Sequence, residues 1–540
     1  MATTPTSGPG DQVRRAAVPF SPQALQEVGA RTLDPVTAPR LGDQTELRAT
    51  AYVGNELLVA GLPSGSAGPV VEALREALVD RDGQPTAVVE VNERDVAAER
   101  VIREVGLPAV TAVAERVWVT RVRLLPVAEA EPQVDAFEAL QRLKSTRSDT
   151  STSASLNHVV GAGANFRGTA VPGDLGGVGF WGGHGGGVGF WGGHGFWGGH
   201  GGPGEYAAPG FGGRMPVAWP GIDPCTNAPK LGRHPVVAVP DTGLGQHPWF
   251  EPGKRAELAA PWHGLPLAAP GLGNPDGALA IDAMTGALEP LAGHGTFIAG
   301  LIRQGCPEAS ILALPVMRAS GSVVEGDLHE VLCLLLLRHV EGQERRAPEL
   351  VIDVLSLSLG YYHESPADEI TDRQFRNLIA EFVDRGVVVV AAAGNDSTEE
   401  RLFPAGFTEP VQGEPGLPIA AVGSLNTSPS TVALFSNAGT WVNAYRPGAA
   451  VVSTMPTNFQ GPGGASTQVP AGAARARATI DPDDYGSGFG VWSGTSFAAP
   501  VLAAEVAAAL AAERSVGTVS VASMRRRAEK ALSKTLEVKP

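Results

Sequence analysis

From about residue 221 onwards, the chain alternates between two hydrophobic patterns. Short, continuous apolar runs of strand length recur, and longer segments with apolar residues at helical spacing lie between them. The apolar runs are Pro235–Pro240, Ile311–Met317, Leu350–Leu357, Val387–Ala393 and Ile419–Gly423. The helical segments are Gly326–His339, Ala367–Arg385 and Thr495–Ala512. Continuous apolar strands that alternate with helices predict an α/β fold, in which helices cover both faces of a parallel sheet.

A second, smaller α/β domain is predicted within residues 1–146. Strands are expected at Leu47–Val53 and Leu57–Leu62, on either side of Gly54-Asn55, and at Ala87–Val91 and Ala112–Pro126. Helices are expected at Pro69–Asp80, Asp95–Val105 and Asp135–Lys144. Residues 1–45 are rich in Pro, Gly, Thr and Ser, so we expect them to be poorly ordered. This domain carries no recognisable catalytic set.

Residues 147–220 are predicted to form a Gly-rich linker. The sequence GVGFWGGHGG at Gly177–Gly186 recurs in shortened form at Gly187–Gly195 and Phe196–Gly201. So much glycine would lose too much conformational entropy to pack as a core. The regularly spaced His184, His194 and His200 could bind a metal weakly, but repeat expansion in a linker is the favoured interpretation. The larger domain is then expected at 221–513, followed by a basic tail at 514–540 with a solvated helix.

Composition and charge narrow the classes of partner. A chain of 540 residues is too long for one compact unit. Its net charge of −15 argues against nucleic acid and anionic membranes, which need a basic face. No run approaches the ~20 apolar residues of a membrane span, and the first residues lack the apolar core of a secretory signal. A cytoplasmic location is therefore expected. Reduced thiols are expected at Cys225, Cys306 and Cys333, with a Cys225–Cys306 bridge as the less favoured alternative.

Three polar residues stand at the ends of predicted elements. Asp241 follows an apolar strand, at the sheet edge where α/β proteins form active sites. His294 opens a helix between two glycines, and Ser496 lies in the first turn of an Ala-rich helix. Serine becomes a good nucleophile only when a base takes its proton and an acid orients that base. Asp241, His294 and Ser496 are therefore predicted to be a catalytic triad, in the chain order Asp, His, Ser.

The surrounding motifs resemble those of the subtilisin-like serine peptidases. PDTG, GHGTFIAG and GTSFAAP are similar to the three signature motifs of that family. Leu355–Gly360 resembles its substrate-pairing strand, and Ala391–Asp396 resembles its oxyanion-hole segment. Further landmarks follow in family order at Phe403-Pro404-Ala405, Phe435-Ser436-Asn437 and Pro447-Gly448. Each motif alone is common, but their order at matching element ends is specific, and together they cover just over half of the chain.

The resemblance implies a subtilisin-like sheet and a serine endopeptidase that acts on proteins or peptides through an acyl-enzyme. Ser496 would be the nucleophile, His294 the base and Asp241 its orienting acid, and Asn395 would donate to the oxyanion. The substrate side chain before the scissile bond (P1) would lie between two segments, Ser358-Leu359-Gly360 and Ala393-Gly394. No cofactor is implied. Calcium is common in the family, but no dense ligand cluster stands out, so no metal site is assigned.

The resemblance also leaves alternatives open. Many family members carry an inhibitory propeptide, so residues 1–146 are interpreted as an intramolecular inhibitor or regulatory domain, with a targeting or partner-binding module as the alternative. Phe297 replaces a second histidine of the common pattern and should alter only local packing. An insertion that includes Pro261-Trp262-His263 is expected to shape the cleft rim, and Gln460–Gly486 to be a loop rather than a lid. The rival functions are a catalytically silent binding protein and an esterase or acyl transferase.

Overall fold

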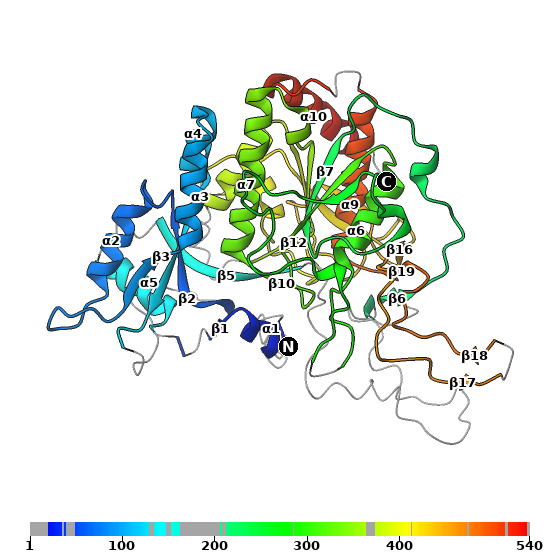
Figure 1. Cartoon of the computed structure of the whole chain (residues 1–540), viewed down its shortest axis with the longest axis horizontal. Coiled ribbons are helices and arrows are strands. Elements are labelled where there is room, and N and C mark those ends of the chain that lie inside the picture. Colours follow the sequence, from blue (N-terminus) through cyan, green and yellow to red (C-terminus); the bar gives the residue numbers. More distant parts are fainter. Residues whose placement is uncertain are drawn as a thin grey trace, which may run out of the picture.

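The structure is a computed structural model that describes most of the chain. The described residues are 20–34, 37–38, 49–128, 134–146, 153–162, 206–207, 212–283, 286–362, 373–411, 413–471, 475–513 and 517–536. They form two α/β units that lie side by side (Figure 1). The predicted repeats and their three histidines lie outside the described residues.

A seven-stranded parallel sheet forms the centre of the larger unit, in the order β15-β14-β13-β11-β7-β9-β8. Its strands are β7 (Val236–Asp241), β8 (Ala256–Leu258), β9 (Ser310–Pro315), β11 (Val354–Leu357), β13 (Val388–Ala392), β14 (Ala420–Leu425) and β15 (Ala444–Pro447). The central strands β11, β13 and β14 are buried along their whole length, because both faces of the sheet are covered. A small antiparallel sheet joins β6 (Met215–Pro216), β16 (Val451–Thr454) and β19 (Phe489–Trp492).

Helices cover both faces of this sheet, as the hydrophobic pattern predicts. α7 (Glu325–Arg345) and α8 (Arg373–Asp384) lie on one side, and α6 (His294–Gly305) and α9 (Thr495–Ala511) on the other (Figure 1). No described helix is long and apolar enough to cross a membrane. The three cysteines are free, and two of them, Cys306 and Cys333, are buried.

The expectation of a separate basic tail is wrong. α10 (Val521–Leu536) packs on α9 and belongs to the larger unit. Its buried face includes Met524, Ala528 and Ala531, which repeat at helical spacing. Arg527 is also buried, where its guanidinium donates to the Thr518 carbonyl at 2.8 Å.

The smaller unit has helices on an antiparallel sheet, but three of its predicted elements are wrong in part. Its strands are β1 (Ala30–Leu33), β2 (Thr50–Ala60), β3 (Val88–Val91) and β4 (Val119–Leu125), and its helices are α1 (Pro22–Glu27), α2 (Ala67–Ala77), α3 (Glu93–Glu104), α4 (Pro108–Val117) and α5 (Ala136–Thr146). β2 runs unbroken through Gly54-Asn55, so the two strands expected there are one. The first half of Ala112–Pro126 is helical, because Val110, Val113 and Val117 at helical spacing pack against α7 and α8. Within residues 1–45, α1 and β1 are regular elements.

One strand connects the two units, and it lies inside the predicted linker. β5 (Ala154–Ala162) pairs antiparallel with β2 of the smaller unit. Its other partners, also antiparallel, are β10 (Ser322–Val324) and β12 (Leu359–Gly360) of the larger unit. The linker prediction is therefore wrong for residues 154–162, whose apolar side chains Leu156, Val159 and Val160 are buried. The hydrogen bonds and buried side chains gained by pairing with distant strands offset the conformational entropy that these residues lose on becoming ordered.

Candidate active site

The acid and the base of the predicted triad meet between β7 and α6. Asp241 is the last residue of β7 and His294 the first of α6, and both are fully buried. The Nδ1 atom of His294 lies 2.8 Å from Oδ1 of Asp241. Because a carboxylate oxygen accepts, Nδ1 carries the proton and Nε2 keeps its lone pair. Among the described residues Nε2 has no hydrogen-bond partner, so it is available to accept a proton.

Asp276 holds the helix turn that presents His294. Its Oδ1 accepts from the Gly293 amide at 3.0 Å, and its Oδ2 accepts from the amide and hydroxyl of Thr296 at 2.9 and 2.5 Å. The first amides of a helix have no partner within the helix, and Gly293 supplies no side chain to cap them. Burial raises the pKa of the Asp276 carboxyl. Sequence reasoning missed this residue, because only folding of the long insertion brings it to the helix.

We predict that Asp276→Ala lowers kcat for peptide hydrolysis by about 10²-fold with little change in KM, because the imidazole loses its fixed orientation. It should also lower the free energy of unfolding by about 1–3 kcal/mol, because buried amides lose their acceptor. Steady-state kinetics and urea unfolding measure both effects. Asp276→Asn keeps one acceptor oxygen and should restore part of kcat. A folded Asp276→Ala enzyme with unchanged kcat would rule out this positioning role.

Ser496 lies in the first turn of α9, next to the predicted substrate strand. Pro500 has no N–H, so the Ser496 carbonyl, four residues earlier, lacks its usual helical partner. That carbonyl accepts instead from the Ser358 hydroxyl at 2.8 Å. In return, the Ser496 hydroxyl donates to the Ser358 carbonyl at 3.3 Å. The two serines therefore fix the predicted substrate strand against the helix that carries Ser496.

Asn395 presents an unused donor next to this turn. Its Oδ1 accepts from the Thr495 amide at 2.8 Å and from the Thr495 hydroxyl at 2.9 Å. These bonds fix the orientation of the amide, and its buried Nδ2 has no partner within the described part of the chain. The side-chain amide of Asn437 fixes the backbone on both sides of Asn395. It donates to the Ala393 carbonyl at 2.9 Å and accepts from the Asp396 amide at 2.9 Å. A buried N–H group without a partner is suited to developing negative charge.

The two predicted substrate segments also converge on α9. In the first segment Ser358, Leu359 and Gly360 are buried, and the last two form β12. In the second segment the Gly394 amide donates to the Thr495 hydroxyl at 3.1 Å. Ala393 is buried beside it. The structure thus pairs Asp241 with His294 at the start of α6. It brings the other predicted site residues to the start of α9: Ser496, Asn395, Ser358, Leu359, Gly360, Ala393 and Gly394. The Ser496 hydroxyl is bonded to Ser358 and not to His294, whose Nε2 has no partner among the described residues.

Aromatic rings enclose the imidazole. The rings of Phe497 and Trp492 lie 5.2 and 5.6 Å from that of His294, measured between centroids. Phe297, in place of the second histidine, packs 4.6 Å from Phe497 and is fully buried. The contact between His294 and Asp241 is present beside it.

The first of the two predicted insertions differs from expectation. The Trp262 indole donates to Glu341 Oε2 at 2.7 Å, and His263 Nε2 lies 2.9 Å from the same oxygen, near the far end of α7. These side chains therefore do not shape the cleft rim. Gln460–Gly486 consists mostly of loop, in which the two-residue strands β17 (Gln468–Val469) and β18 (Arg477–Ala478) form a hairpin that projects from the body of the molecule (Figure 1).

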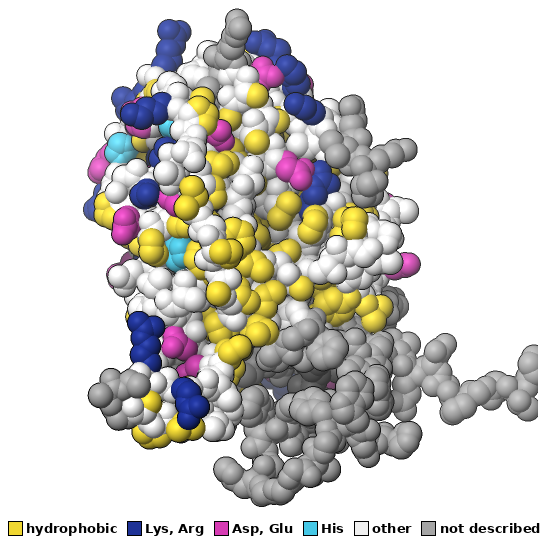
Figure 2. Space-filling view, turned by 90° about the vertical axis from the view of Figure 1, so that its right-hand side faces the viewer, with side chains coloured by type: hydrophobic (Ala, Val, Ile, Leu, Met, Phe, Trp, Pro, Cys, Tyr) yellow, Lys and Arg dark blue, Asp and Glu magenta, His cyan; other side chains and the backbone are white. Residues whose placement is uncertain are grey.

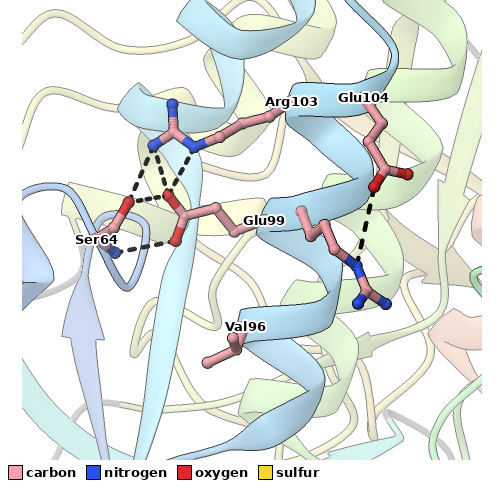
Figure 3. A pocket seen from close by; sticks show the side chains of 6 residues that line it. Ser64, Val96, Glu99, Arg103 and Glu104 are labelled. Carbon is pink, nitrogen blue, oxygen red and sulfur yellow. Dashed lines mark hydrogen bonds and ion pairs between the residues drawn. The ribbon is translucent and has the colours of Figure 1, made fainter.

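A pocket on the smaller unit offers no comparable chemistry. It is a shallow hollow of about 470 Å³ beside α3, lined by Ser64, Glu99 and Arg103 among others (Figure 3). Glu99 accepts from the Ser64 amide at 2.9 Å and from the Arg103 guanidinium at 3.0 Å, so these groups satisfy one another. Elsewhere too, the described residues hold no group of three or more His, Cys, Asp or Glu side chains that could bind a metal ion.

Comparisons with known proteins agree with the motifs. The model of the subtilase family (Peptidase_S8) matches residues 232–536, more than half of the chain. Subtilisin E of Bacillus subtilis (strain 168) is 29% identical over 238 residues, which cover 41% of this chain and 55% of that protein. A thermophilic serine proteinase of Bacillus sp. (strain AK1) is 29% identical over 178 residues, which cover 31% and 37%. The chain thus spans about a third to a half of the length of these curated relatives.

Solved structures are similar only loosely. The crystal structure of fervidolysin from Fervidobacterium pennivorans, a keratinolytic enzyme related to subtilisin, matches at 17% identity and a TM-score of 0.42, covering 88% of this chain and 58% of that one. That likeness is too loose to carry an argument. The family match spans the parallel sheet and every predicted site residue, and the chain belongs to the subtilase family.

Proposed function

We propose that the protein is a serine endopeptidase that cleaves protein or peptide substrates through an acyl-enzyme. The observation that carries the proposal is the geometry of His294. Its Nδ1 is paired with Asp241, its Nε2 is unpaired among the described residues, and its ring lies against Phe497, the residue after Ser496. Membership of the subtilase family supports the same chemistry.

The proposed mechanism gives each of these side chains one role. Rotation about the Cα–Cβ bond of Ser496 would turn its hydroxyl from the Ser358 carbonyl towards His294. His294 Nε2 then takes the proton as the oxygen attacks the scissile carbonyl. Asn395 Nδ2 and the backbone N–H of Ser496, at the positive end of α9, would donate to the oxyanion. His294 gives the proton to the leaving amine, and a water molecule releases the acyl group by the same steps in reverse.

Hydrolysis of an amide and of its matching ester tests this proposal. Wild type should cleave both, and Ser496→Ala should cleave neither above background. A protein that binds peptides without cleaving them would be a catalytically silent subtilase, and turnover of the ester alone would indicate an esterase or acyl transferase. The net charge of −15, and a face on which basic and acidic side chains are interspersed (Figure 2), favour peptides over nucleic acid as substrate.

We further propose that the smaller unit inhibits the active site within the same chain. Peptides commonly bind proteins by adding a strand to a sheet edge. β12 contains two of the predicted substrate-binding residues, and β5 pairs with it, placing Gly161 opposite Gly360. β5 therefore takes the edge along which a substrate would extend. Two side chains of β5 bind to the start of α7. Asn157 Oδ1 accepts from the Gly326 amide at 2.9 Å, and His158 Nδ1 lies 2.7 Å from Glu325 Oε2.

A buried ionic network holds the two units together. Arg121 of β4 is 2% exposed and lies 3.1 Å from Asp95 of its own unit. It also lies 2.9 Å from Asp327 and 2.7 Å from Glu330, both on α7 of the other unit. Removing one member of a buried ion pair leaves an uncompensated charge, which is strongly destabilising.

We predict that Arg121→Met weakens this contact by about 3–5 kcal/mol and releases inhibition. Freshly purified Arg121→Met protein should hydrolyse a short peptide faster than wild type. Arg123→Met is the matched control, because Arg123 lies two residues further along the same strand in an exposed pair with Glu56 and should leave the rate unchanged. Equal rates for wild type and Arg121→Met would contradict an inhibitory contact.

Self-processing is tested separately. Mass spectrometry of purified wild type and Ser496→Ala should show cleavage between the two units only in wild type. If both proteins stay intact at 540 residues under assay conditions, self-processing is wrong.

A further inference from the structure

We infer that Leu402 fills the pocket for the P1 side chain, so that this peptidase cleaves after small residues such as glycine, alanine or serine. The inference rests on the proposed peptidase function and specifies its substrate class. The Leu402 side chain lies between the two predicted substrate segments.

The two walls of the pocket are both anchored to the nucleophile helix. The Ser358 hydroxyl bonds the Ser496 carbonyl, which fixes the strand that ends at Gly360. The Gly394 amide bonds the Thr495 hydroxyl, which fixes the second wall. The resemblance to the subtilisin-like family implies that the P1 side chain of a substrate would lie between these two backbones.

Leu402 already occupies that space. A Cβ atom placed on Gly360 would lie 2.6 Å from Cγ and 2.7 Å from Cδ2 of Leu402. A Cβ atom placed on Gly394 would lie 3.0 Å from the same Cδ2. One methyl group of Leu402 thus packs against both walls. A Cβ atom would also lie 2.7 Å from the Phe403 carbonyl oxygen at Gly360 and 2.4 Å from Asn437 Nδ2 at Gly394, so only glycine fits at either position. The side chain is 4% exposed, so it is held within the protein rather than directed into solvent.

Neighbouring bonds prevent the pocket from widening easily. Phe403, directly after Leu402, exchanges two backbone hydrogen bonds of 3.0 Å with Tyr361, directly after β12. The Tyr362 hydroxyl lies 2.6 Å from Asp396 Oδ2 and 2.7 Å from Asn437 Nδ2, which links the first wall to the second. Because protein interiors are close-packed, this pocket cannot admit a large side chain unless another side chain moves.

The chain's own sequence is compatible with small residues at the cleft. β5 ends in Gly161-Ala162. Neither residue carries a side chain larger than a methyl group. An inhibitory strand that resembles a substrate would be expected to carry residues that the pocket accepts.

Kinetics with paired peptides test the inference. Two peptides that differ only in Ala or Phe at P1 are compared in wild type, Leu402→Ala and Leu402→Gly. Wild type should favour Ala by about 10²-fold in kcat/KM, the scale on which a closed apolar pocket discriminates. Each variant should raise kcat/KM for Phe by at least about 10-fold and change that for Ala by only about threefold. Leu510→Ala removes an equally buried leucine from the far end of α9 and should leave the ratio unchanged.

The two possible failures are distinct. A wild type that prefers Phe, or a preference that Leu402 variants leave unchanged while Ser496 still reacts with a fluorophosphonate, would overturn the pocket inference alone. No turnover of either peptide together with no fluorophosphonate labelling would overturn the peptidase function on which it rests.

Discussion

Replacing His294 with alanine is expected to lower kcat for peptide hydrolysis by about 10⁶-fold, with KM little changed. The magnitude comes from subtilisin, where loss of the histidine costs about as much as loss of the whole triad. In the proposed mechanism His294 Nε2, which has no partner among the described residues, would take the proton of Ser496, while Nδ1 is paired with Asp241. Steady-state kinetics on a chromogenic peptide measure the change.

His263→Ala is the control for that variant. His263 also pairs with a carboxylate, Glu341, but near the far end of α7. It should leave kcat unchanged. If the two histidine variants had equal kcat values, His294 would not be the base.

Replacing Asn395 with leucine is expected to lower kcat by about 10²–10³-fold, again with KM little changed, because its amide would donate to a charge that develops only in the transition state. This magnitude too was measured on the equivalent donor of subtilisin. The bonds from Thr495 to Oδ1 leave Nδ2 as the atom available to the substrate. Rates measured at saturating substrate report kcat, so they distinguish a lower kcat from weaker substrate binding.

Asn443→Leu provides the matched control. The Asn443 amide is satisfied by backbone on both sides, accepting from the Ala421 amide and donating to the Ile419 carbonyl, each at 2.9 Å. Its loss should lower thermal stability and leave kcat of the folded enzyme unchanged. An Asn395→Leu variant with wild-type kcat would exclude the oxyanion role.

The larger unit could be predicted because its signals are local. Uninterrupted apolar runs define strands such as β7 and β13, since a parallel sheet buries both faces. Asp241 ends one of these strands, and His294 and Ser496 lie in the first turns of helices α6 and α9, which adjoin the same edge of the sheet. The pattern of the family then adds Asn395 and the substrate segments, which sequence periodicity alone would not identify.

The parts that escaped prediction depend on distant partners. β5 is followed by a Gly-rich sequence, so the whole segment resembled a linker. Its partners β2, β10 and β12 are far away in the sequence. The β-branched residues of α4 favour a strand locally, but packing against α7 and α8 selects a helix. Asp276 and Leu402 acquire their roles only through contacts with α6 and with the two glycine walls.

Labelling with a fluorophosphonate, followed by mapping of the adduct by mass spectrometry, tests most directly whether these residues form a working nucleophile. The account predicts one adduct, on the peptide that contains Ser496, and none on Ser496→Ala protein treated in parallel. A folded wild type that stays unlabelled under conditions that label subtilisin, or a Ser496→Ala variant labelled as strongly as wild type, would contradict it.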